Sequence, residues 1–195
     1  MKHQLKEEII QEWVDHLDSD EWVIKLFEKV RDIPYGDINS RDPKDVYEKR
    51  KGTCSGKHEL LKELYDELGI ETKDFIALHK FNDLNVVFPK EIKRILDEYE
   101  IFDYHNFFKI LVNGDWITVD VTWDRPLKKL GFFVNENWDG KSNMELCVVP
   151  IEIFEVEDSV LSKKQKLMDL PKETQKYRKI FLEELTVWLD EFRSK

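Results

Sequence analysis

The sequence predicts an α+β protein built around a mainly antiparallel sheet. Apolar side chains recur at helical spacing in the first 30 and the last 25 residues. Segments with strand character lie between these two regions, and Asn113-Gly114 is the strongest short signal for a hairpin turn. Helices that lead, strands that follow and a helix that closes are typical of this fold class.

Helices are expected at the start of the chain. The apolar side chains that recur every four positions are Leu5, Ile9, Trp13 and Leu17, and then Trp22, Leu26 and Val30. The polar residues Asp18, Ser19 and Asp20 interrupt the pattern, so we expect one helix on each side of them. A further short helix over 40–47 is expected to lead into a glycine-containing loop.

A central helix is expected to begin at Cys54 and to end at Gly69. Glycine adopts the left-handed conformation that commonly ends a helix. The apolar residues of this segment form one stripe, which consists of Leu60, Leu61, Leu64, Tyr65 and Leu68. A stripe of this kind indicates that one face of the helix packs against the core.

The rest of the chain is expected to supply the sheet and the closing helix. Strands are predicted over 75–78, 84–88, 132–134 and 145–153, a short helix over 89–99 and a hairpin over 104–123. The last 25 residues are expected to form a helix whose apolar side carries Tyr177, Phe181, Leu185, Trp188 and Phe192.

Length and composition indicate one globular domain over residues 1–195. Hydrophobic residues make up 41% and charged residues 37% of the chain, which fits a folded, water-exposed protein rather than a disordered one. No Pro/Gly/Ser-rich linker and no internal repeat divides the sequence.

The charge and hydropathy patterns argue against nucleic acid and membranes as partners. The net charge is −10 and no basic stripe is present, so nucleic acid is not expected to bind. No apolar run approaches the roughly 20 residues of a membrane span, so we expect no membrane insertion. We therefore expect a cytoplasmic protein, in which the two cysteines, Cys54 and Cys147, stay reduced.

Cys54 is the main candidate for chemistry. It follows Gly52 and Thr53 and opens the predicted central helix. The unpaired N–H groups and the partial positive charge of a helix N-terminus favour a thiolate over a thiol. His105 and Asp120 come later in the chain, and a thiol, an imidazole and a carboxylate are the parts of a nucleophilic triad.

The predicted hairpin brings His105 and Asp120 together. A two-residue turn at Asn113-Gly114 places His105 opposite Thr122. His105 and Asp120 are then diagonal neighbours on one face, roughly 7–8 Å apart at the backbone. The other face carries only apolar side chains, which are Phe108, Ile110, Val112, Ile117, Val119 and Val121.

Three blocks of the sequence resemble the transglutaminase-like superfamily, a papain-like group that includes transglutaminases and many microbial cysteine peptidases and amidases. The blocks are Gly52-Thr53-Cys54-Ser55-Gly56 with Leu68-Gly69-Ile70, then His105-Asn106-Phe107, then Asn113-Gly114-Asp115-Trp116 continuing to Asp120-Val121-Thr122-Trp123. They occur in the family's order and span about residues 44–124.

The resemblance implies a thiol-dependent acyl-transfer enzyme. Cys54 becomes the nucleophile, His105 the general base and acid, and Asp120 the group that orients the imidazole. The implied activity is that of a cysteine peptidase or amidase, which cleaves a peptide or protein substrate through a thioester and needs no cofactor or metal. We expect hydrolysis rather than transamidation because water is always available, and a protein-glutamine transglutaminase is the alternative.

Other interpretations stay open at this level. The cleft of this fold also serves non-catalytic domains that bind peptides or proteins. Cys54 and His58 stand four residues apart, a spacing that presents both to one metal ion, with His79 or His105 as further ligands. The sequence leaves the oligomeric state open.

The sequence offers several candidates for the supporting residues of an acyl-transfer site. Asp103 and Asp124 are alternatives to Asp120. The Cys54 backbone N–H is one candidate oxyanion donor. Glu48, six residues earlier, is an acceptor and is unsuited to be the second.

Overall fold

The computed structural model describes residues 1–14, 16–18 and 21–194. Its helices are α1 (His3–Val14), α2 (Trp22–Arg31), α3 (Pro43–Lys49), α4 (Cys54–Glu67), α5 (Lys90–Glu98), α6 (Ser159–Met168) and α7 (Lys172–Arg193), with short 3₁₀ turns η2 (Phe81–Asp83) and η3 (Arg125–Leu130). Its strands are β1 (Thr72–Lys80), β2 (Phe102–Val112), β3 (Asp115–Val119) and β4 (Glu152–Val156). Ser19 and Asp20, in the predicted break, lie outside the described residues.

The four strands form one antiparallel sheet in the order β3-β2-β1-β4, which confirms the α+β class. The hairpin has the predicted register, with Val112 opposite Asp115 and Phe108 opposite Val119. Asn113 and Gly114 have φ values of 54° and 93°, as a turn with two left-handed central residues requires.

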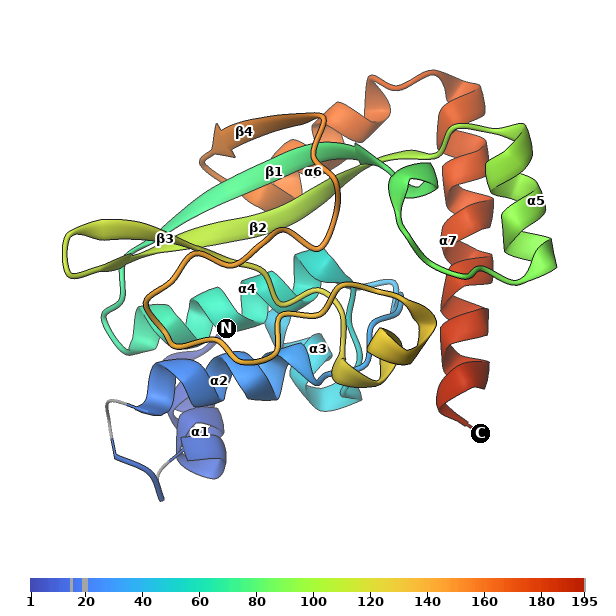
Figure 1. Cartoon of the computed structure of the whole chain (residues 1–195). Helices are drawn as coiled ribbons and strands as arrows, with labels where there is room; N and C mark the ends of the chain where they lie inside the picture. The colour runs from blue at the N-terminus through green and yellow to red at the C-terminus, as the bar shows by residue number, and fades with distance from the viewer. Residues whose placement is uncertain (15, 19–20, 195) are drawn as a thin grey trace.

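Helix α4 lies at the centre of the molecule, as predicted. The sheet covers one side of it, and α1 and α2 cover the other (Figure 1). Most of its apolar stripe is fully buried, since Leu60, Leu61 and Leu64 have no exposed surface, whereas Leu68 at its end is half-buried. They pack with Phe108 and Val119 from the hairpin. The first residue of α4 is therefore held by a well-packed helix.

The C-terminal helix α7 packs on the opposite end of the sheet from the hairpin turn, next to α5 (Figure 1). Phe181 and Leu185 are completely buried in a second apolar cluster, which also contains Trp123 and Phe132. The apolar side predicted for the last 25 residues is therefore confirmed. A separate helix, α6, precedes it and begins where the Asp158 side chain accepts a hydrogen bond from the Leu161 N–H.

Helix α4 ends as the glycine predicts. Gly69 has a φ of 72°, and the N–H of Ile70 donates to the carbonyl of Tyr65 at 2.9 Å. This bond closes the end of the helix and turns the chain toward β1.

Two of the predicted strands are wrong, and a third is right only at its end. Residues 84–88 form tight turns, in which the N–H of Val86 donates to Leu84 and that of Phe88 to Val86. Residues 132–134 are irregular, and only the end of 145–153 belongs to a strand, because β4 begins at Glu152. Apolar side chains gave these segments a strand-like pattern, but only some of them are buried, and most of these residues pair with no neighbouring strand.

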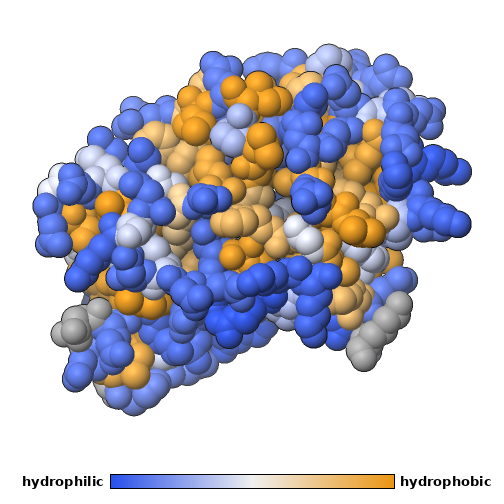
Figure 2. Space-filling view, in the orientation of Figure 1, coloured by the Kyte–Doolittle hydropathy of each residue, from blue (hydrophilic) through white to orange (hydrophobic). Residues whose placement is uncertain are grey.

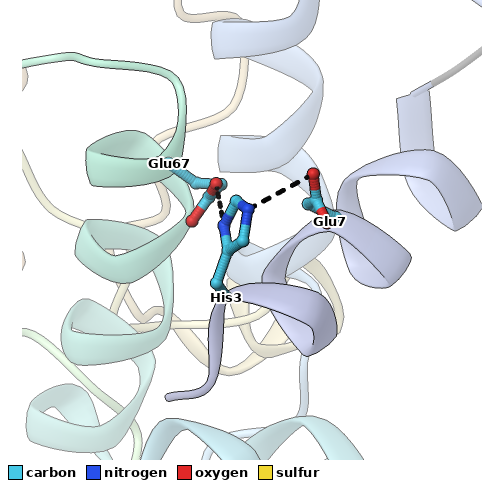
Figure 3. Close-up of side chains that lie close together, drawn as sticks. All are labelled: His3, Glu7 and Glu67. Carbon is cyan, nitrogen blue, oxygen red and sulfur yellow. Dashed lines mark ion pairs between the residues drawn. The ribbon is translucent and has the colours of Figure 1, made fainter.

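An exposed ion-pair cluster joins α1 to the last turn of α4. His3 Nδ1 lies 2.6 Å from Glu67 Oε1, and His3 Nε2 lies 3.5 Å from Glu7 Oε1 (Figure 3). The ammonium of Lys6 lies 3.6 Å from the other oxygen of Glu67. Because Cys54 is at the opposite end of α4, roughly 20 Å away along the helix, this cluster is not part of its surroundings.

No helix within the described residues is long and apolar enough to cross a lipid bilayer.

Candidate active site

Cys54 is the first residue of α4, where the sequence places it. Thr53 precedes it in an extended conformation, with φ −79° and ψ 174°. Gly56 allows α3 to approach this first turn closely, since a Cβ at that position would lie 2.7 Å from a methyl group of Val46. The Cys54 side chain is buried, with 5% of the residue exposed.

His105 and Asp120 meet on the hairpin as predicted. His105 lies on β2, and Asp120 directly follows β3. The Nε2 of His105 is 2.7 Å from Oδ2 of Asp120, and both side chains are buried. The Cys54 thiol and the His105 imidazole are close enough that each shifts the pKa of the other. Since Nε2 is occupied by Asp120, Nδ1 is the nitrogen that is left for the thiol.

Two segments hold the Asp120 carboxylate in place. Oδ1 accepts hydrogen bonds from the Thr122 hydroxyl at 2.6 Å and from the Thr122 N–H at 3.1 Å. Oδ2 accepts one from the N–H of Cys147 at 2.8 Å. The carboxylate therefore has partners on both oxygens besides His105, and the irregular segment around Cys147 serves to fix it.

The electrostatics favour a thiolate and an imidazolium. Burial raises the pKa of Cys54, but the Lys163 ammonium and the interaction with His105 outweigh it and lower the pKa to about 5. Burial lowers the pKa of His105, but the Asp120 carboxylate outweighs it and raises the pKa to about 10. The two groups therefore carry opposite charges at neutral pH.

Lys163 is a neighbour of the thiol that the sequence did not indicate. It comes from α6, and its Nζ lies 3.7 Å from Cys54 Sγ and 3.5 Å from Asp103 Oδ1. Asp103 also accepts from Arg178 Nε of α7 at 2.9 Å. Arg178 and Lys163 hold the pKa of Asp103 below its usual range despite burial. Asp103 therefore positions Lys163 and is not in contact with His105.

His58 joins α4 to the segment that follows β3. Its Nδ1 donates to the Cys54 carbonyl at 2.6 Å, and its Nε2 accepts from the N–H of Val121 at 3.1 Å. Both ring nitrogens are therefore occupied, and Nε2 also lies 3.5 Å from Oδ1 of Asp120. These bonds leave His58 no free lone pair for the metal site considered with Cys54, and they fix the distance between Cys54 and Asp120.

Two further buried polar side chains lie near the site. The Ser55 hydroxyl donates to Asn106 Oδ1 at 2.5 Å, so Asn106 ties the strand of His105 to the helix of Cys54. His79 on β1 stacks edge-on against His105, with ring centroids 6.2 Å apart. Burial lowers the pKa of His79 to about 3, and its Nδ1 has no hydrogen-bond partner among the described residues.

The alternative acids lie elsewhere. Asp124 accepts from Arg193 Nε at 3.0 Å and from the Tyr35 N–H at 2.8 Å, and it ties the end of α7 to the loop before α3. Glu48 is exposed and lies 3.6 Å from Lys44 on the surface of α3. Neither carboxylate faces His105.

Comparisons with known proteins add little to this geometry. No family model matches the chain, and no curated protein does. Among solved structures, it is similar to a candidate cysteine protease from Cytophaga hutchinsonii, with 19% sequence identity and a TM-score of 0.46. The similarity covers 66% of this chain and only 40% of that protein. A likeness of this size leaves the side chains of the site as the basis for a functional argument.

Proposed function

We propose that this protein is a cysteine-dependent acyl-transfer enzyme, most simply a peptidase or amidase. One observation carries the proposal: Cys54 lies beside His105, each of the two shifts the pKa of the other, and His105 Nε2 is 2.7 Å from a fixed carboxylate of Asp120. A structural cysteine needs neither partner. Nucleophile, base and orienting acid in this relation are what thiol-dependent acyl transfer requires.

In the proposed reaction, the Cys54 thiolate attacks the carbonyl carbon of an amide. The carbonyl electrons move to oxygen, where the N–H of the first turn of α4 is a donor for the oxyanion. The C–N bond then breaks, and His105 gives its proton to the departing amine. The product is a thioester on Cys54 and a neutral imidazole, which Asp120 keeps in the tautomer that accepts the next proton.

Water completes the proposed cycle. His105 removes a proton from water as its oxygen attacks the thioester carbon, and the acid is released with Cys54 again as thiolate. An amine in place of water gives transamidation, the alternative. Hydrolysis is preferred because transamidation requires a site that excludes water and admits an amine.

Trapping of the thioester tests this function. Wild-type protein incubated with an amide or peptide library is expected to gain an acyl mass on Cys54 that hydroxylamine removes, with free acid accumulating in solution. The Cys54→Ala variant is the control and should show neither. An amine adduct without free acid would overturn hydrolysis in favour of transamidation.

A second candidate function is peptide binding without catalysis. Apolar side chains gather across the middle of one face of the molecule (Figure 2). A hollow of about 240 Å³ is lined by Trp123, Phe132 and Phe133 among others, and Val149 beside it is 54% exposed. Binding of peptides at full affinity by Cys54→Ala, together with an absence of acyl adducts in the wild type, would favour this function.

A further inference from the structure

A cavity of about 590 Å³ opens beside Cys54, between α6, α7 and the loop before α3. Ser55, the second residue of α4, lies in its wall. So does Lys163, whose Nζ is 3.7 Å from Cys54 Sγ. A ligand in this cavity is therefore only one side chain away from the thiol.

The lining is strongly basic, although the protein as a whole carries a net charge of −10. The basic side chains in the wall are Arg41, Lys163, Lys164, Arg178 and Lys179. Asp37 in the wall pairs with Arg41. Asp103 and Glu183 lie outside the wall and pair with Arg178 and Lys179, respectively. Five basic side chains thus face three acidic ones and the Cys54 thiolate, which leaves an excess of one positive charge.

The positions of these cations favour a ligand rather than internal pairing. Lys164 is exposed and forms no ion pair with any residue that the structure describes. Arg178 is held by Asp103 through a single oxygen. The N-terminus of α4 adds its partial positive charge on the same side. Val160 and Leu167 of α6 supply an apolar wall for a hydrocarbon stem.

We propose that this cavity is a specificity subsite for a carboxylate, and that Cys54 acts on peptides that carry an acidic side chain next to the attacked carbonyl. The inference rests on the proposed function for the attack itself, whereas binding of the carboxylate requires only the cavity. Lys163 links the two, because it touches the thiol and lines the subsite.

Two alkylating reagents of nearly equal size test the subsite. Iodoacetate carries the carboxylate and iodoacetamide does not. At Cys54, the ratio of the iodoacetate rate to the iodoacetamide rate is expected to be several-fold higher than for a cysteine in an unstructured peptide. Lys164→Glu should lower this ratio by roughly threefold, as a charge reversal at about 10 Å predicts.

A matched variant separates the subsite from overall charge. Lys172→Glu makes the same change on exposed surface at the start of α7, outside the cavity. It should leave the ratio at the wild-type value. A ratio equal to that of the unstructured peptide, or an equal loss in both variants, would overturn the subsite.

A binding measurement keeps this test independent of the proposed chemistry. Cys54→Ser protein is titrated, with detection by NMR, with peptides that differ only in Glu, Gln or phosphoserine at one position. Tighter binding of the Glu peptide than of the Gln peptide, lost in Lys164→Glu, supports the subsite even if Cys54 proves unreactive. Equal binding of Glu and Gln, or a response to phosphoserine alone, overturns it.

Discussion

The Lys163 ammonium gives the Cys54 thiolate a second cation besides His105. It lies 3.7 Å from Sγ in a buried setting, where a charge is screened far less than on the surface. Asp103 and Arg178 fix its position, so three residues from β2, α6 and α7 act on the thiol together. The C-terminal helices therefore take part in the electrostatics of the site.

Lys163→Gln is expected to raise the pKa of Cys54 while His105 keeps its contact. Loss of one close cation destabilises the thiolate and should raise its pKa by roughly 1–2. Each pKa unit corresponds to about 1.4 kcal/mol of lost stabilisation. The measurement is the pH dependence of Cys54 alkylation, with Lys166→Gln on the same helix as the control. An unchanged profile in Lys163→Gln would show that His105 alone sets the pKa.

At the residue scale, the sequence predicts those site residues whose relative positions are set by local structure. His105 and Asp120 follow from counting outward from the Asn113-Gly114 turn, and Cys54 from its place at a helix start. Lys163 is 109 positions from Cys54, on a helix that carries no signal of its own. Only tertiary packing brings that lysine to the thiol.

At the element scale, the end of α4 depends on one backbone conformation. Gly69 has a φ of 72°, and a Cβ there would contact nothing within 4 Å. Any cost of substitution is therefore conformational rather than steric crowding. That makes the position a clean test of how the helix end contributes to stability.

Gly69→Ala is expected to lower the free energy of unfolding by about 1 kcal/mol, because alanine disfavours the left-handed region. Gly69→Asn should cost less, since asparagine tolerates that region. Urea unfolding of both variants measures the difference. Equal stability of the alanine and glycine forms would contradict the conformational argument.

Element prediction succeeded for the long helical patterns and for the hairpin, and it failed for short segments, such as 84–88 and 132–134, that had apolar character without a turn. The hairpin had both its alternation and its Asn113-Gly114 turn. Residues 145–153 had apolar character only. There the Cys147 N–H donates to the Asp120 carboxylate, and the Cys147 carbonyl accepts from the Trp123 indole N–H. Side-chain partners bind the backbone of this segment in place of the neighbouring strand that the pattern predicts.

At the scale of the whole molecule, we propose that residues 1–195 form one folding unit. The two apolar clusters meet at α4, since Cys54 belongs to the cluster of α7 while Leu60 belongs to that of α1 and α2. One domain is predicted from the length of the sequence and the lack of a linker. The packing of α7 against the end of the sheet could not be predicted from the sequence.

Phe181→Ala is expected to destabilise the entire protein by about 3–5 kcal/mol, because it opens a cavity at a fully buried position of α7. Val187→Ala on the same helix, 55% exposed, should change stability by less than about 0.5 kcal/mol. Urea unfolding followed at the tryptophans should show one transition in each. A separate early transition in Phe181→Ala would contradict a single unit.

The pairing of Cys54 with His105 is the central claim, and the pH dependence of Cys54 alkylation tests it most directly. Iodoacetamide is used on wild type and His105→Ala, with peptide mapping to separate Cys54 from Cys147. A lowered thiol pKa means that reactivity is gained as pH rises through it. The wild type should therefore become reactive near pH 5 and stay so through neutral pH, and the variant should need a higher pH. A Cys54 that reacts only near its ordinary pKa of 9.0, with or without His105, would contradict the account.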